Sequence, residues 1–230
     1  MSVTVHADMV QGSGHWLAAR CGLLTASEFD RIITPTLKVA ANAKERAHLW
    51  ELAAQRISKY VEPSYIGDAM LRGFDDEIRA RDLYSKTYAP VTECGFVTND
   101  AWGFTLGCSP DGLVGDDGLI ECKSRAQKFQ VQTIVDYFSD GTAPSDFMLQ
   151  VQGQLLITER KWCDLISYSG GLPMVAMRIE PDLEIQDAIV EAAAKFEARI
   201  NEVVGIWNRA LRSDARLIST ERVIEQEMYS

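Results

Sequence analysis

Apolar residues recur every three or four positions through the C-terminal part of the chain. The repeat begins at Ile185, passes through Phe196 and Trp207, and ends at Leu211. This spacing places the apolar side chains on one face of an α-helix, whereas a half-buried strand would alternate them. The pattern therefore predicts a long amphipathic helix over about residues 182–211.

Shorter helical patterns fill the N-terminal part of the chain. The expected helices cover about residues 16–20, 25–33, 43–60 and 66–86. The second begins at Thr25-Ala26-Ser27-Glu28, which has the T-x-x-E form of a capping box with Thr25 as the N-cap. Pro35 follows this helix and ends it, because proline cannot continue the backbone hydrogen bonding.

From residue 91 the pattern changes to short apolar stretches separated by turn residues. Strands are expected over about residues 91–97, 103–107, 118–123, 163–168 and 174–180, with helices over about residues 126–138 and 146–158 between them. This order predicts an α/β fold in which a central mixed β-sheet is flanked by helices. The chain has 230 residues and is 47% hydrophobic, which favours one large domain over residues 1–230.

The composition favours a reduced, cytoplasmic protein. The five cysteines are an odd number and form no C-x-x-C pair, which argues against a zinc ribbon and a disulfide framework. The three histidines form no ligand pair, so we expect no histidine-based metal site. No apolar run approaches the roughly 20 residues that a membrane span needs. Residues 1–6 lack the basic start of a signal peptide.

The net charge of −10 argues against binding to nucleic acid, because duplex-binding proteins are typically basic. The acid is unevenly spread, however. Residues 180–230 contain eleven acidic and six basic residues. Residues 121–128 carry three basic side chains against one acidic side chain. A locally positive cleft on an acidic protein is therefore compatible with the sequence, since net charge does not describe one groove.

Two carboxylates and a lysine surround a predicted hairpin. Asp111 lies in the turn-like sequence Ser-Pro-Asp-Gly, and Glu121 and Lys123 follow on the returning strand. Alternate residues of a strand share a face, so Glu121 and Lys123 lie on the same side. Two carboxylates and an ammonium on one face suit a divalent metal and phosphodiester hydrolysis. The alternative is that Asp111 serves only as a turn residue.

Two further polar side chains can reach this face. Glu77 falls at the margin of an apolar helix face and either reaches over the sheet or stays an ordinary boundary carboxylate. Gln150 is one of three glutamines in an otherwise apolar helix, where buried amides need partners. These amides either pack the helix on the sheet or bind an attacking water or a phosphate.

Arg20 and Ser27 form a second candidate site. Ser27 is expected in the first turn of a capped helix, where free backbone N–H groups favour anions, and Arg20 lies a short loop upstream. A guanidinium and a hydroxyl at a helix N-terminus suit a phosphate. Ser109, close to Asp111, can add a second hydroxyl. Alternatively, Ser27 only caps the helix and Arg20 pairs with a surface acid.

Taken together and in this order, these segments resemble the lambda-type phage exonucleases, also described as YqaJ-like viral recombinases or alkaline exonucleases, within the PD-(D/E)xK nuclease superfamily. The resemblance covers about residues 15–158. The segments that carry it are His15-Trp16, Arg20, 22–28, Gly73 with Glu77, 108–113, 118–123 and 148–152. The resemblance implies a restriction-endonuclease-like core.

The resemblance also implies two-metal hydrolysis with Mg²⁺, for which Mn²⁺ can substitute. The implied metal ligands are the carboxylates of Asp111, Glu121 and Glu77 and the backbone carbonyl of Cys122. Lys123 would orient or deprotonate the attacking water and stabilise developing charge, and Gln150 would help to position that water. Arg20, Ser27 and Ser109 would hold the 5′-terminal phosphate.

By the same resemblance we expect a 5′→3′ exonuclease acting on linear double-stranded DNA. It would release 5′-mononucleotides and leave a 3′ overhang. The family implies a ring-shaped homotrimer that works beside a single-strand annealing protein. Such a ring can retain DNA by enclosing it, so the protein needs less electrostatic attraction, which its negative net charge does not favour.

The chain departs from the family pattern near the catalytic lysine and in one helix. Ser124-Arg125 stands where a proline is common, and Arg72 stands where an aromatic residue is common. A further basic residue for the terminal phosphate is either Lys128 or Arg125. These departures affect the expected recognition of the DNA end and separation of the strands more than they affect the expected metal site.

Three other functions are compatible with parts of the sequence. A PD-(D/E)xK endonuclease or single-strand nuclease would use the same carboxylates, but it needs no pocket for a terminal phosphate. A non-catalytic DNA-binding module would not need Asp111, Glu121 and Lys123 together. The third alternative, an acidic interaction domain that does not bind nucleic acid, is supported only by the net charge.

Overall fold

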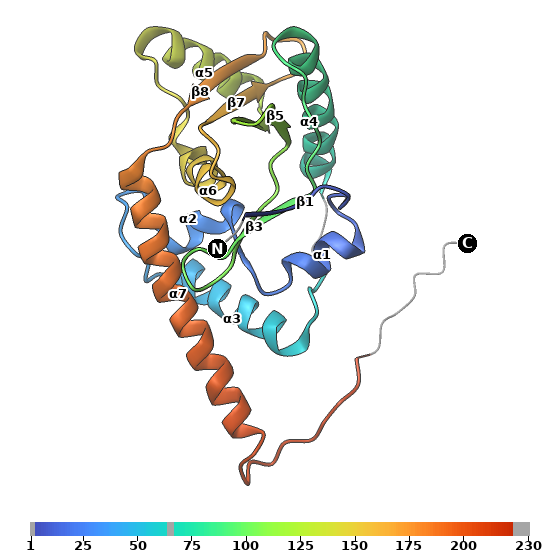
Figure 1. The fold of residues 1–230 in the computed structure, drawn as a ribbon, viewed down its shortest axis with the longest axis vertical. Helices are drawn as coiled ribbons and strands as arrows, with labels where there is room; N and C mark the ends of the chain where they lie inside the picture. The colour runs from blue at the N-terminus through green and yellow to red at the C-terminus, as the bar shows by residue number, and fades with distance from the viewer. Residues whose placement is uncertain (1–2, 64–66, 223–230) are drawn as a thin grey trace, which may run out of the picture.

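The computed structural model describes residues 3–63 and 67–222 (Figure 1). The first residue of the expected 66–86 helix and the last eight residues of the acidic tail lie outside these ranges. The helices are α1 (Gly14–Arg20), α2 (Phe29–Ile32), α3 (Ala43–Ser58), α4 (Asp68–Thr87), α5 (Gln127–Asp140), α6 (Met148–Thr158) and α7 (Leu183–Ala210), with 3₁₀ turns η1 (Ala26–Glu28) and η2 (Ser145–Phe147). The strands are β1 (Val3–His6), β2 (Leu24–Thr25), β3 (Phe96–Asn99), β4 (Leu106–Cys108), β5 (Gly112–Val114), β6 (Gly118–Ser124), β7 (Trp162–Tyr168) and β8 (Val175–Ile179).

The described strands form two four-stranded sheets. One has the order β1-β3-β4-β2, with β2 and β4 parallel and the other pairs antiparallel. The other has the order β5-β6-β7-β8, with β6 and β7 parallel and the hairpins β5-β6 and β7-β8 antiparallel. The prediction of mixed strands flanked by helices is confirmed. The hairpin that carries Asp111 and Glu121 is present, and Gly112 pairs with Ile120 within it.

The long helix α7 confirms the C-terminal periodicity. Its N-cap is Asp182, whose carboxylate accepts hydrogen bonds from the backbone N–H groups of Glu184 and Ile185. Ile189, Phe196 and other residues of its apolar face are buried in the core. In Figure 1 this helix runs along one side of the molecule, beside α3.

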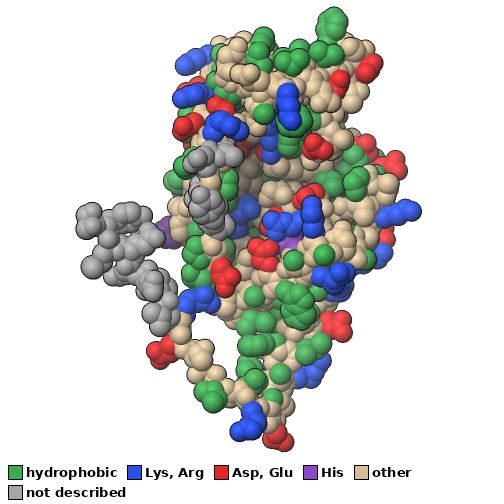
Figure 2. Space-filling model, turned by 180° about the vertical axis from the view of Figure 1, so that it is seen from behind, with side chains coloured by type: hydrophobic (Ala, Val, Ile, Leu, Met, Phe, Trp, Pro, Cys, Tyr) green, Lys and Arg blue, Asp and Glu red, His purple; other side chains and the backbone are tan. Residues whose placement is uncertain are grey.

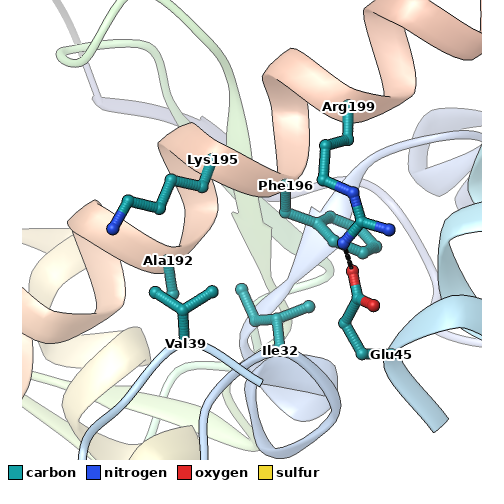
Figure 3. A pocket seen from close by; sticks show the side chains of 7 residues that line it. All are labelled: Ile32, Val39, Glu45, Ala192, Lys195, Phe196 and Arg199. Atoms are coloured by element: carbon teal, nitrogen blue, oxygen red, sulfur yellow. Dashed lines mark hydrogen bonds and ion pairs between the residues drawn. The ribbon is translucent and has the colours of Figure 1, made fainter. Parts of the chain in front are cut away.

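Two ion pairs join α7 to α3. Arg56 makes a two-pronged hydrogen bond to Glu197, with N–O distances of 2.6 and 2.7 Å, and Arg199 pairs with Glu45. Beside the second pair lies a small cavity of about 20 Å³, lined by Ile32 and Phe196 among others (Figure 3). A cavity of this size holds about one water molecule and no nucleotide. The functional site therefore lies elsewhere.

Helix α6 packs closely against the N-terminal segment. A Cβ atom on Gly153 would lie only 2.3 Å from the ring of Phe29, so this position accommodates only glycine without a shift. Val151 and Leu155 of the same helix are buried against the strands of the second sheet. The close approach fixes the height of α6 above β6, and hence the position of its glutamines.

The expected capped helix over residues 25–33 is wrong in its details. Residues Ala26–Glu28 form a 3₁₀ turn, and the α-helix that follows spans only Phe29–Ile32. The Thr25 hydroxyl makes no backbone capping bond; it donates to the Glu28 carboxylate at 2.9 Å. The reason is tertiary, because Leu24–Thr25 pair with β4 as strand β2 and Arg20 also binds the Thr25 hydroxyl.

Some strand boundaries also differ from expectation. The strand expected over residues 91–97 is found at Phe96–Asn99, and the strand expected over 103–107 at Leu106–Cys108. Thr92 makes only an isolated bridge, to Leu113. Strands β1 and β2 were not expected, because four and two residues carry too little periodic pattern to be recognised. No helix in the described part of the chain combines the length and apolar character that crossing a bilayer requires.

Candidate active site

Strand β6 presents Glu121 and Lys123 on one face, as the alternation predicts. Glu121 is almost fully buried, and each of its carboxylate oxygens has a donor. Oε1 accepts hydrogen bonds from the Lys123 ammonium and the Gln150 amide, each at 2.6 Å. Oε2 accepts one from the Gln154 amide at 2.7 Å. Three donors therefore fix the orientation of this carboxylate.

Asp111 lies at the start of β5, directly beside this face. Its Oδ2 accepts a hydrogen bond from the backbone N–H of Cys122 at 2.5 Å. Burial raises the pKa of Asp111 well above its ordinary range, and the negative charges of Glu121 and Glu77 add to the effect. A carboxylate just before β5 and one on β6 thus lie close enough for each charge to affect the other.

Glu77 reaches the same place from helix α4. Burial raises its pKa, the nearby charge of Glu121 raises it further, and Arg81 acts in the opposite direction at 3.5 Å. Arg81 also donates to the backbone carbonyl of Asp111 at 3.3 Å. The structure therefore brings all three predicted carboxylates, Glu77, Asp111 and Glu121, into one electrostatically coupled group.

Lys123 occupies the open side of this group. Its ammonium lies 2.6 Å from Glu121 Oε1 and donates to Gln150 Oε1 at 2.8 Å. Burial disfavours the charged form, but the Glu121 and Asp111 carboxylates outweigh that effect, so the pKa of Lys123 is raised. Lys123 is therefore protonated at neutral pH, and its ammonium nitrogen lies 5.1 Å from the ring centroid of Phe147.

The three side chains predicted to hold a phosphate lie together. The guanidinium of Arg20 stacks over the ring of Trp16 and donates to the Thr25 hydroxyl at 3.1 Å. The Thr25 and Ser27 hydroxyls are 3.3 Å apart, and the Trp16 indole donates to the Ser109 hydroxyl at 2.9 Å. Because Ser109 is two residues before Asp111, this cluster adjoins the carboxylates.

The helix-terminus part of the phosphate prediction is wrong. Ser27 belongs to a three-residue 3₁₀ turn, which lacks the aligned N–H groups of an α-helix. Its hydroxyl is exposed and joins the cluster through Thr25 instead. The side chains of Arg20 and Ser109, rather than a helix dipole, supply the polar groups here.

Arg125 and Lys128 have different neighbours from Arg20. The Arg125 guanidinium lies 5.1 Å from the ring centroids of both Phe129 and Phe147, and the Lys128 ammonium lies 4.7 Å from that of Phe129. Phe147 also contacts Lys123, so this aromatic cluster adjoins the catalytic face. The assignment of either residue to a terminal phosphate remains a prediction.

A second group of ligand-type side chains lies outside this site. Within the described ranges, Glu28, His48 and Glu51 have ligand atoms within 4.8 Å of one another. One guanidinium nitrogen of Arg31 lies 3.0 Å from Glu51, 3.1 Å from His48 and 3.4 Å from Glu28. An arginine thus already contacts all three members of this group, which fits an ion-pair cluster better than a metal site.

The sequence did not single out three residues of the site. Gln154 holds Glu121, Arg81 contacts both Glu77 and Asp111, and Thr25 links Arg20 to Ser27. Gln154 and Arg81 each lie four residues after a predicted site residue on the same helix, a spacing that places them on the same face. That spacing could have identified them.

Comparison with known proteins identifies the family. The profile of the YqaJ-like viral recombinase domain matches residues 15–161. The chain belongs to the YqaJ-like viral recombinase family. The match includes every residue predicted for the catalytic and phosphate-binding groups. A search of curated proteins found no match.

Solved structures agree with this membership. An alkaline exonuclease, LHK-Exo, from Laribacter hongkongensis is 32% identical, with a TM-score of 0.70, and the alignment covers 86% of this chain and 99% of that one. A structure of LHK-Exo in complex with dAMP gives 33% identity and a TM-score of 0.71 over the same shares of the two chains. A phage-related exonuclease from Haemophilus somnus 129PT, at 12% identity and a TM-score of 0.60, covers 80% of this chain and 96% of its own; it shares the fold. The PD-(D/E)xK-type fold predicted from the sequence is confirmed.

Proposed function

We propose that this protein is a Mg²⁺-dependent exonuclease that degrades one strand of linear double-stranded DNA in the 5′→3′ direction. It releases 5′-mononucleotides and leaves a 3′ overhang. The observation that carries the proposal is that the Arg20–Trp16–Ser109 cluster adjoins the carboxylates through the short segment from Ser109 to Asp111. A grip on a terminal phosphate beside a hydrolytic centre would fix where the cut is made.

The residues present fit divalent ions. Asp111 and Glu77 have raised pKa values because burial disfavours their charged forms and because nearby carboxylates repel them; a divalent cation would favour the charged forms. Asp111, Glu121, Glu77 and the Cys122 carbonyl supply oxygen ligands only, which suit Mg²⁺ or Mn²⁺ better than zinc. Bound there, two such ions would polarise the phosphodiester and lower the pKa of water.

The protein side chains supply position and charge. Glu121 is held by Gln154, so that it keeps one orientation as substrate enters. The Lys123 ammonium and the Gln150 amide point at the same carboxylate oxygen from different elements. We assign them the orientation of the attacking water and the stabilisation of charge on the phosphate. The raised pKa of Lys123 favours this role over that of a general base.

End recognition would come from the second cluster. Arg20 is stacked on Trp16, and burial lowers its pKa, although the nearby Glu28 opposes the shift. Even so, it remains charged at neutral pH, because arginine side chains are not deprotonated in proteins. A guanidinium whose plane is fixed by stacking suits a terminal phosphate, and the hydroxyls of Ser27 and Ser109 add donors. An endonuclease would have no use for such a pocket.

Assembly follows from the family resemblance. We propose a homotrimeric ring that works with a single-strand annealing protein. Lys128 and Arg125 are assigned to DNA contact outside the metal centre, because both lie at the aromatic cluster beside Lys123. The negative net charge then requires that DNA be retained by enclosure more than by long-range attraction.

The direction of degradation can be tested with end-labelled DNA. Linear duplex labelled at its 5′ ends should release labelled mononucleotide from the first turnover in Mg²⁺. The same duplex labelled at its 3′ ends should keep its label in long strands. Early release of the 3′ label as mononucleotide would contradict the proposed direction.

A further inference from the structure

A hollow of about 320 Å³ lies outside the carboxylate site, between α5 and the segment that leads into η2. Arg125, Phe129 and Thr133 line one side of it, and residues 142–146 line the other. Pockets for small ligands start at about 300 Å³, so the hollow has the size of one nucleotide. Figure 2 shows hydrophobic side chains gathered at the end of the molecule where α5 lies in Figure 1.

Arg125 is the unusual member of this lining. Its guanidinium lies 5.1 Å from the ring centroids of both Phe129 and Phe147. Its Nε atom is buried and has no hydrogen-bond partner within the described part of the chain. Buried donors normally have partners, so this nitrogen points to a missing acceptor. Phe147 contacts both Arg125 and Lys123, so a lining residue of the hollow lies one aromatic ring away from Lys123.

The remaining groups of the hollow match a nucleotide. Phe129 is partly exposed and offers an aromatic face on which a base can stack. Arg125, which lines the hollow, offers positive charge to a phosphate, and Lys128 lies outside the lining but close to the Phe129 ring. Asp136 and Asp146 line the hollow, and carboxylates accept hydrogen bonds from the exocyclic amino groups of bases.

We infer that this hollow binds a nucleoside 5′-phosphate, with its base on Phe129 and its phosphate toward Arg125 and Lys128. The inference rests on the proposed function, because DNA hydrolysis is what brings nucleotides to this surface. The nucleotide comes either from a DNA strand beside the scissile bond or from the released mononucleotide. Both sources present the same base and phosphate.

The test is binding of dAMP to the full chain in excess EDTA, measured by equilibrium dialysis. EDTA removes divalent ions, so the carboxylate site cannot hold the phosphate through a metal. Phe129→Ala should weaken binding about ten-fold, the effect of losing one base-stacking contact. Arg125→Lys should also weaken it, because a lysine keeps the charge but not the stacked plane. Phe138→Ala is the matched control, since Phe138 is on the same helix, 90% exposed and outside the hollow.

The result that overturns the inference is absence of dAMP binding to the wild-type chain, or equal binding by wild type and Phe129→Ala. If Phe129→Ala does not fold, Thr142→Tyr fills the hollow from its other wall and should abolish binding in the same way. Competition by a short single-stranded oligonucleotide assigns the site to a DNA strand; no competition assigns it to the released product. Because binding is measured without hydrolysis, loss of this inference leaves the exonuclease proposal standing.

Discussion

Glu121 shows how the site is organised at the level of single residues. A buried carboxylate is costly unless its oxygens are hydrogen-bonded. Here Lys123, Gln150 and Gln154 supply donors from one strand and one helix. Asp111 accepts a hydrogen bond from the backbone N–H of Cys122, but burial and the nearby charges of Glu121 and Glu77 raise its pKa. The two carboxylates thus differ in how much they need an added cation.

Replacing the lysine tests its assigned role. Lys123→Ala should reduce DNA cleavage at least about 100-fold, because it removes a preorganised positive charge beside the phosphate. The free energy of unfolding and DNA affinity in the absence of Mg²⁺ should change little. Lys161→Ala is the matched control, since Lys161 is an exposed lysine paired with Asp117. Cleavage by Lys123→Ala at the wild-type rate would remove the catalytic assignment.

The raised pKa of Asp111 predicts a pH dependence of stability in EDTA. A carboxyl group whose pKa is raised by folding binds more protons in the folded state. Its contribution is therefore complete below the ordinary carboxyl pKa of about 4 and is lost as the pH rises through the raised value. Between pH 5 and pH 8, wild type should lose more stability than Asp111→Asn, as measured by urea unfolding. Equal losses, or a larger loss in the variant, would contradict the assigned environment. Addition of Mg²⁺ at pH 8 should stabilise wild type and not the variant.

At the level of elements, helix α6 carries glutamine side chains on two faces, and the two faces contact different parts of the molecule. Gln150 and Gln154, four residues apart, bind the Glu121 carboxylate on β6. Gln152 points the other way; it donates to the Glu180 carbonyl and accepts from the backbone N–H of Asp182. Gln150 and Gln154 orient the Glu121 carboxylate, and Gln152 anchors the start of α7.

The two faces predict separable effects. Gln154→Ala should lower kcat about ten-fold or more, because a group that orients a ligand carboxylate is lost, and should change KM little. Gln152→Ala should leave kcat unchanged and reduce the free energy of unfolding by about 1–3 kcal/mol, since buried backbone groups lose their partner. Steady-state kinetics and urea unfolding of both variants distinguish the roles. Loss of kcat in Gln152→Ala with none in Gln154→Ala would reverse the assignment.

The sequence predicted most of the elements because their signals are local. Helix α7 has eight regular apolar positions, and Glu121 and Lys123 follow from strand alternation alone. The 3₁₀ turn at Ala26–Glu28 could not be predicted, because it depends on β2 pairing with a strand about 80 residues later and on Arg20 binding Thr25. Gln154, by contrast, follows Gln150 by one helical turn, so its place on the same face was predictable, although its bond to Glu121 on another element was not.

At the level of the molecule, a group of carboxylates lies beside a group that contains an arginine and several hydroxyls. The carboxylates Glu77, Asp111 and Glu121 come from α4 and the β5–β6 hairpin. Arg20 and the nearby hydroxyl groups come from α1, β2, the η1 turn and the loop before β5. The segment at Ser109–Asp111 is where the two meet. Arg20 thus places a positive charge and several hydroxyl groups beside the carboxylates of a protein whose net charge is −10.

Removing the arginine should affect one kind of DNA end. Arg20→Ala should lower kcat/KM about 10- to 100-fold on 5′-phosphorylated duplex, because a charge-assisted hydrogen bond is lost, and less on 5′-hydroxyl duplex. Arg46→Ala is the matched control, since Arg46 is an exposed arginine on α3. An equal loss on both kinds of end would contradict the phosphate pocket.

The measurement that tests the central claim most directly compares three forms of one DNA in Mg²⁺: linear with 5′-phosphate, linear with 5′-hydroxyl, and a covalently closed circle. The account predicts mononucleotides from the linear forms, fastest with the 5′-phosphate, and an unchanged circle. A nicked or linearised circle would contradict it, because internal cutting would mean that the carboxylate site acts without a grip on a DNA end.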